Sequence, residues 1–131
     1  MESSDTAFSL IISTRNRDHS LLRTLESLRR LTTSVSWELV IVDNGSSDAT
    51  PLVLNDFVTT FAGPVQLVNE PKRGLANAHN AGCHTARSAI CVFTDDDCYP
   101  AADYLDAVSL CFAEDPRIGF IGGRILPWSE D

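Results

Sequence analysis

Three consecutive carboxylates, Asp95, Asp96 and Asp97, directly follow an apolar run that ends in Phe93 and Thr94. At the end of a buried strand they would repel one another, and desolvation would add to this cost unless a cation or a proton compensates. Mg²⁺ or Mn²⁺ suits this role, because both prefer oxygen ligands and commonly use one or two carboxylates with phosphates and water. The alternative is a solvated acidic loop that caps the next helix. The position after an apolar strand favours the metal site.

A second polar block runs from Asp43 and Asn44 through Gly45 to Asp48. On its own it could be an Asx-type turn that leads into a helix cap. At the end of a strand beside the first one, the Asp43 carboxylate could instead accept hydrogen bonds from a nucleotide base N–H or a ribose hydroxyl. Lys72 and Arg73 would be ordinary surface charges in isolation, but beside so many carboxylates they could offset phosphate charge. The polar segments after the first and third apolar runs add further candidates for substrate binding, which are Thr14, Asn16, Arg17, Gly74 and Asn77.

Five short apolar segments are predicted strands, over residues 8–12, 37–42, 65–68, 89–94 and 118–121. Their starts are 29, 28, 24 and 29 residues apart, which is typical of parallel strands joined by right-handed helical crossovers. The runs FSLII, LVIV and ICVF are nearly all apolar, as expected for strands covered on both faces. Because ligands bind at the carboxyl ends of such strands, this layered α/β sheet would bring the polar blocks together.

Four helices are expected between these strands. Leucines at helical spacing predict the first over roughly residues 21–31, with Asp18 or Ser20 as its N-cap. Asp48 is the expected N-cap of the second, with Pro51 in its first turn. The third is expected over about residues 74–86 and the fourth over about residues 101–112. The fourth is expected to bury Leu105, Val108, Cys111 and Phe112.

Length and composition indicate one domain, over residues 7–131, with a disordered start at residues 1–6. A net charge of -8 argues against nucleic acid as a partner, because binding its backbone needs a basic face. The apolar runs are too short for a transmembrane segment, and the opening MESSDTA lacks the features of a secretory signal. We therefore expect a cytoplasmic protein whose four cysteines are reduced and mostly structural.

Four blocks in order, FSLIISTRNR, WELVIVDNGSSDAT, NEPKRGLANAHNAG and CVFTDDDCYPAADYL, resemble the family 2 glycosyltransferases. The resemblance covers almost the whole chain and implies the GT-A fold, a Rossmann-like layered sheet. It also implies an inverting transfer of sugar from a nucleotide-diphosphate sugar, with UDP-sugar the expected donor, to an acceptor hydroxyl. The cofactor it implies is Mg²⁺ or Mn²⁺.

The same resemblance assigns roles to individual residues. It implies that Thr14 and Asp43 contact the base, and that Arg73 or Lys72 lies near it. It also implies that Asp95 approaches the ribose and that Asp97 is the principal metal ligand, with Asp95 as a second candidate. Asp96 is kept among the substrate-binding candidates, because the register of the acidic motif relative to Pro100 varies among relatives.

The sequence departs from the family pattern in three ways. Ser13 stands where many relatives have Pro, and His79 replaces the usual Arg of an Ala-Arg-Asn block. The family's acceptor segment and catalytic base lie beyond the matched region, so the chain is expected to supply the donor and metal half. The base is then expected beyond Asp131, in a longer native protein that could lie at the inner face of the membrane.

Other functions remain to be weighed against this one. A non-catalytic nucleotide-sugar-binding or scaffold module of the same fold is the main alternative. A sugar nucleotidylyltransferase would carry a Gly-rich, Lys-containing loop after the first strand, but STRNRDHS contains no glycine. The Rossmann glycine fingerprint and the P-loop GK[ST] are absent from the corresponding turns.

Overall fold

The centre of the molecule is a pair of parallel strands, β1 (Phe8–Thr14) and β2 (Trp37–Asp43), in a computed structural model that describes residues 6–128. The sheet has the order β3-β2-β1-β4, with β3 (Val65–Asn69) and β4 (Cys91–Asp95) at its edges, and every pairing is parallel. Nearly all of β1 and β2 is buried, as their continuous apolar runs predict, whereas the edge strands are partly exposed. The predicted disordered segment lies outside the described residues, except for Thr6.

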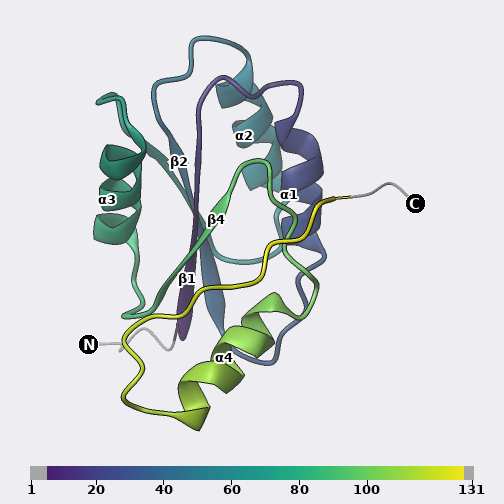
Figure 1. Ribbon diagram of the computed structural model, residues 1–131. Helices are drawn as coiled ribbons and strands as arrows, with labels where there is room; N and C mark the ends of the chain where they lie inside the picture. Colours follow the sequence, from purple (N-terminus) through teal and green to yellow (C-terminus); the bar gives the residue numbers. More distant parts are fainter. Residues whose placement is uncertain (1–5, 129–131) are drawn as a thin grey trace.

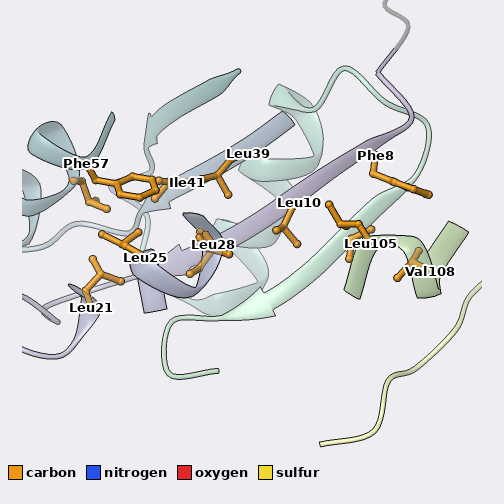
Figure 2. Close-up of a cluster of buried hydrophobic side chains, with 13 residues drawn as sticks. Phe8, Leu10, Leu21, Leu25, Leu28, Leu39, Ile41, Phe57, Leu105 and Val108 are labelled. Carbon is orange, nitrogen blue, oxygen red and sulfur yellow. The ribbon is translucent and has the colours of Figure 1, made fainter. Parts of the chain in front are cut away.

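Helices cover both faces of this sheet (Figure 1). One face carries α1 (Leu21–Arg29), α2 (Thr50–Thr60) and α4 (Tyr104–Glu114), which pack on Leu10, Ile12 and their neighbours. Figure 2 shows this larger cluster, with leucines of α1 beside Leu39 and Ile41 of β2. The other face carries α3 (Leu75–Thr85), which packs on Ile11, Val40 and Val42. Alternate residues of each central strand therefore belong to different cores.

The contact between α3 and the sheet depends on a glycine. A Cβ atom placed on Gly82 would lie only 2.5 Å from Cγ2 of Ile11, which is fully buried. The small residues of this helix therefore serve close packing on β1. This contact fixes α3 over the central strands and so positions the loop that precedes it.

Helix boundaries differ from the predictions by a few residues. The N-cap position of α2 is Ala49 rather than Asp48, although Asp48 Oδ1 still accepts the N–H of Thr50 at 2.9 Å. Ser20 occupies the N-cap position of α1 without a side-chain hydrogen bond. The prediction that Cys111 is buried is wrong, because α4 turns this residue to solvent, whereas Leu105 and Val108 are buried and Phe112 is partly buried.

The predicted strand over residues 118–121 is also wrong. Residues 117–128 form no strand, and the Phe120 side chain is 90% exposed. A strand needs a partner to satisfy its backbone, and glycines at 119, 122 and 123 weaken the segment's own preference for one. The segment instead returns from α4 toward the side of α1, as its yellow trace shows (Figure 1).

A buried carboxylate joins the strands at the amino-terminal end of the sheet. Glu38 in β2 is 1% exposed and accepts hydrogen bonds from Ser9 Oγ at 2.7 Å, Gln66 Nε2 at 2.8 Å and the Arg87 N–H at 2.6 Å. Burial raises the pKa of Glu38, but these hydrogen bonds outweigh it and hold the pKa below its usual value. The carboxylate therefore ties the segment before β4 to β1, β2 and β3.

None of the helices within residues 6–128 has the length and apolar character to cross a membrane.

Candidate functional site

The strand register brings the predicted polar residues to one edge of the sheet. Thr14 pairs with Asp43, Asp43 pairs with Asn69, and Ser13 pairs with Asp95. Thr14 and Asp43 are almost fully buried, with 3% and 9% of their surface exposed. The sequence blocks predicted to act together therefore meet where parallel sheets bind ligands.

Asp43 forms the Asx-type turn that the sequence allows as an alternative. Its Oδ1 atom accepts the Ser46 N–H at 3.1 Å, and Gly45 has a φ of +75°, which favours glycine. The Asn44 N–H donates to the carbonyl oxygen of Thr14 at 2.9 Å, which extends the contact between β1 and β2. The turn thus holds the Asp43 carboxylate at the mouth of the sheet.

Asn44 fixes the loop between β3 and α3. Its Nδ2 donates to the carbonyl oxygens of Glu70 and Lys72 at 2.8 and 2.9 Å, and its Oδ1 accepts the Gly74 N–H at 3.0 Å. Gly74 is the N-cap of α3 with a φ of +124°. The amide of Asn44 therefore positions the backbone that carries Lys72 and Arg73, and both of these cations are exposed.

Asn16 joins the loops that follow β1 and β2. Its N–H donates to Ser46 Oγ at 3.0 Å, and its Oδ1 accepts the Ser47 N–H at 2.7 Å. Its φ of +53° is uncommon outside glycine and suits asparagine best among the other residues. Asn77 has a similar local role, because its Nδ2 donates to the Arg73 carbonyl at 2.9 Å. Asn16 and Asn77, which the sequence predicts to bind substrate, therefore hold the loops in place through these hydrogen bonds.

The three carboxylates do not point the same way. Asp96 turns back toward β1, where its Oδ2 accepts Thr14 Oγ1 at 2.9 Å and lies 3.5 Å from Nε of Arg17. Its backbone carbonyl accepts Thr24 Oγ1 at 2.6 Å. Burial raises the pKa of Asp96, and its acidic neighbours add to this effect, while Thr14 and Arg17 oppose it. Asp96 therefore anchors the acidic loop to β1 and α1.

Asp95 and Asp97 are exposed and converge with Cys98. One ligand atom from each of the three residues lies within 4.8 Å of the others. Burial, followed by the nearby carboxylates, raises the pKa of the Cys98 thiol, so this sulfur stays protonated at neutral pH. The group thus offers two carboxylates to a hard cation. Cys98 was not predicted for this site, although its place directly after the acidic triplet is a signal that could have identified it.

A cavity of about 680 Å³ opens beside these two carboxylates, between β4, the start of α4 and the segment 123–128. Its walls include Asp95, Asp97, Tyr99, Tyr104, Arg124 and Trp128. Sequence reasoning missed the last four, because nothing in their spacing shows that the chain returns to β4. A smaller cavity of about 270 Å³ around Trp37 and Phe61 lies away from the acidic loop.

Comparisons with known proteins agree with this geometry. The Glycosyl transferase family 2 model matches residues 9–127. Glycosyltransferase AglE of Haloferax volcanii is 30% identical over 118 residues, which are 89% of this chain and 38% of that protein.

Two solved structures are also similar. Mannosyltransferase PcManGT from Pyrobaculum calidifontis, solved with GDP-Man and Mn²⁺, has a TM-score of 0.76 and 30% identity over 86% of this chain and 33% of its own. The structure of S. aureus TarS 1-349, which has also been solved with UDP-GlcNAc, has a TM-score of 0.74 and 21% identity over 95% of this chain and 39% of its own, a likeness of fold. The chain thus spans less than half the length of each of these proteins. Because the family model matches residues 9–127, almost the whole chain, this protein belongs to glycosyl transferase family 2.

Proposed function

We propose that this chain binds a nucleotide-diphosphate sugar together with a divalent cation, as the donor half of an inverting glycosyltransferase. The observation that carries the proposal is the split of the acidic triplet. Asp96 is tied to Thr14 and Arg17, whereas Asp95 and Asp97 remain exposed and converge beside a cavity. An acidic loop that served only as a solvated cap would not require this division.

Asp97 and Asp95 fit Mg²⁺ or Mn²⁺ in the chemistry of their donor atoms. Each offers carboxylate oxygen, and these ions are commonly held by one or two carboxylates, with substrate phosphates and water in the other positions. Two carboxylates with a single sulfur suit a hard cation better than a soft metal, which prefers several thiolate ligands. A bound ion would stabilise the negative charge of the departing diphosphate.

The nucleoside would lie across the ends of β1 and β2. Thr14 and Asp43 are positioned there by strand pairing, and Asn44 holds the loop of Lys72 and Arg73 against the same edge. These two cations could balance phosphate charge that the carboxylates would otherwise repel. The relatives solved with GDP-Man and Mn²⁺ or with UDP-GlcNAc support a nucleotide sugar as the ligand class.

The second candidate is a binding module of the same fold without turnover. It is favoured because transfer needs a base, and the carboxylates among the described residues of the cavity wall, Asp95 and Asp97, are already assigned to the cation. Donor hydrolysis and transfer assays separate the two functions, because only an enzyme releases free sugar or glycosylated product. Both candidates share the binding step, so that step is the first to test.

Thermal unfolding tests the binding step with UDP or GDP in the presence of Mg²⁺ or of EDTA. We expect a nucleoside diphosphate to stabilise the protein only with the metal, by about 2.7 kcal/mol at a hundredfold excess over Kd. Glu114→Gln is the control, because it removes an exposed charge at the far end of α4 and should leave the shift unchanged. Equal stabilisation with EDTA would contradict a metal-bridged site.

A further inference from the structure

One stripe of α3 lies against β4, outside the site described above. The ring of His79 in α3 packs against the ring of Phe93 in β4, with their centroids 4.7 Å apart. Cys91 is two residues before Phe93, so it lies on the same face of the sheet, where it packs against the smaller core with Ile11. The contact between His79 and Phe93 therefore fixes how α3 and β4 are aligned.

This alignment brings Cys83 opposite Cys91. The chain follows α3 away from the site and returns along β4, so the two elements run antiparallel (Figure 1). Four residues along a helix advance about 6 Å and return to the same face, and two residues along a strand cover about 6.6 Å. The step from His79 to Cys83 is thus matched by the step from Phe93 back to Cys91. A side-chain hydrogen bond between the two thiols agrees with this register.

We propose that Cys83 and Cys91 form a redox modification site, at which a low-molecular-weight disulfide such as oxidised glutathione converts the two thiols into a disulfide between α3 and β4. Both cysteines are free in the structure. The loop of residues 86–90 separates them, so the bond would close a short covalent ring across the contact between helix and strand. This inference does not depend on the proposed function, because neither cysteine belongs to the cavity wall or the cation group.

The two thiols differ in exposure, which sets the order of the reaction. Cys83 is exposed, whereas Cys91 is partly buried, and burial followed by the nearby Cys83 raises the pKa of the Cys91 thiol. The Cys83 thiolate therefore attacks oxidised glutathione first and releases one glutathione thiolate. Cys91 then loses its proton to solvent, and its thiolate attacks Sγ of Cys83 and releases the second glutathione. Two protein thiols are oxidised by two electrons, and one glutathione disulfide is reduced to two glutathione thiols.

A metal site fits this pair less well than a disulfide. His79 lies on the same stripe as Cys83, but its ring packs against Phe93. Within residues 6–128, the group of three ligand side chains that converges on one point is Asp95, Asp97 and Cys98. Structural zinc sites almost always use four ligands, so two thiols without converging partners favour a bond to each other.

Thiol counting and peptide mapping test the proposal on the folded 131-residue chain, incubated with oxidised glutathione. Trypsin cleaves after Arg87, between the two cysteines, and places them in the peptides 74–87 and 88–117. We expect two of the four thiols to be lost and these two peptides to stay joined until dithiothreitol is added. Fragmentation of the joined peptides should place the bond at Cys91 rather than at the other two cysteines of its peptide.

Two variants separate this bond from general oxidation. Cys83→Ser should prevent the link, and it should fold like the wild type because Cys83 is exposed. Cys111→Ser is the matched control, since it removes an exposed cysteine of α4 and should leave the link unchanged. Oxidised wild type should unfold at a higher urea concentration than reduced wild type, because a cross-link restricts the unfolded chain. Cys83→Ser should show no such shift.

Several products would overturn the inference. Glutathione that stays attached to Cys83 would show that Cys91 cannot reach it in the folded protein. A bond from Cys83 to Cys98 or Cys111, a covalent dimer, or four unreacted thiols would contradict the assigned pair equally. Nucleotide binding is measured separately on the reduced protein, so its failure would overturn the proposed function and leave the disulfide unaffected.

Discussion

Asp96 and Asp97 are adjacent in sequence but take opposite roles, because successive side chains at the end of β4 diverge. Asp96 is held by Thr14 and Arg17, while Asp97 lies with Asp95 at the cavity. Composition predicts a cation near such a triplet, but the direction of each side chain depends on the hydroxyl and guanidinium that lie beside it. Those partners come from β1 and the loop after it, about eighty residues earlier.

We predict different defects for two carboxylates of the site. Asp97→Ala should abolish metal-dependent nucleotide binding, whereas Asp43→Ala should weaken nucleotide binding by about tenfold, roughly 1.4 kcal/mol, and leave weak metal binding intact. Calorimetric titration with Mn²⁺ and then nucleotide measures both steps.

Asp43→Asn separates the turn from the charge, because its amide oxygen can still accept the Ser46 N–H. It should fold like the wild type and still bind nucleotide less tightly. Undiminished metal-dependent nucleotide binding by Asp97→Ala would show that this residue is not the principal ligand.

Glu38 gives a prediction for stability against pH. Its pKa is lowered on folding, so its stabilising effect is complete above its ordinary value of 4.5 and is lost as the pH falls through the lower folded value. Glu38→Gln places an amide donor opposite the Gln66 donor and should cost about 2–3 kcal/mol at pH 7. Urea unfolding should show this difference shrinking as the pH falls below 4.5. A difference that stays constant with pH would contradict the assigned charge.

At the scale of elements, α3 packs closely on β1 at Gly82. Gly82→Ala would improve helix propensity by up to about 1 kcal/mol, but its methyl group would overlap the buried Ile11 side chain. We predict a net destabilisation of about 1–2 kcal/mol, measured by urea unfolding. Asn80→Ala on the exposed part of the same helix is the control and should change stability by less than about 0.5 kcal/mol. Equal stability of Gly82→Ala and the wild type would show that α3 can move away from β1.

The sequence predicts best those elements whose local hydrophobic pattern agrees with their burial in the fold. β1 and β2 are continuous apolar runs and are buried on both faces, so the pattern predicts both the strands and their parallel pairing. Residues 118–121 are equally apolar, but local composition does not reveal whether a strand edge lies within reach. The same reason explains why Trp128 was not predicted at the cavity. Its neighbours, Tyr99 and Arg23, come from distant parts of the chain.

At the scale of the whole molecule, the excess of negative charge must be reconciled with an anionic ligand. The chain has a net charge of -8, so a nucleoside diphosphate approaches against an unfavourable average field. Asn44 holds the loop of the exposed Lys72 and Arg73 at the edge where Asp43 lies, and a divalent cation at Asp95 and Asp97 would neutralise their negative charge. Binding is therefore a property of the assembled sheet edge rather than of any one motif.

The last prediction concerns the 131-residue chain as a catalyst. We expect it to bind donor and metal but to transfer sugar very slowly, because transfer requires a base within hydrogen-bond reach of the acceptor hydroxyl. Among the described residues that line the cavity, Asp95 and Asp97 would be occupied by the cation. Burial raises the pKa of both Cys98 and Tyr104, so neither is a base at neutral pH.

A transfer assay with the purified chain and its preferred nucleotide sugar measures this directly. The expected result is tight binding by calorimetry with little product, and a gain of activity in a chain extended by an acceptor-binding region from the same family. The control is Asp97→Ala, which identifies product made by a contaminating enzyme. Robust transfer by the 131-residue chain that disappears in Asp97→Ala would place the base within this chain. In that case the acceptor proton would have to pass to a group outside the cavity wall, and the division into donor and acceptor halves would be wrong.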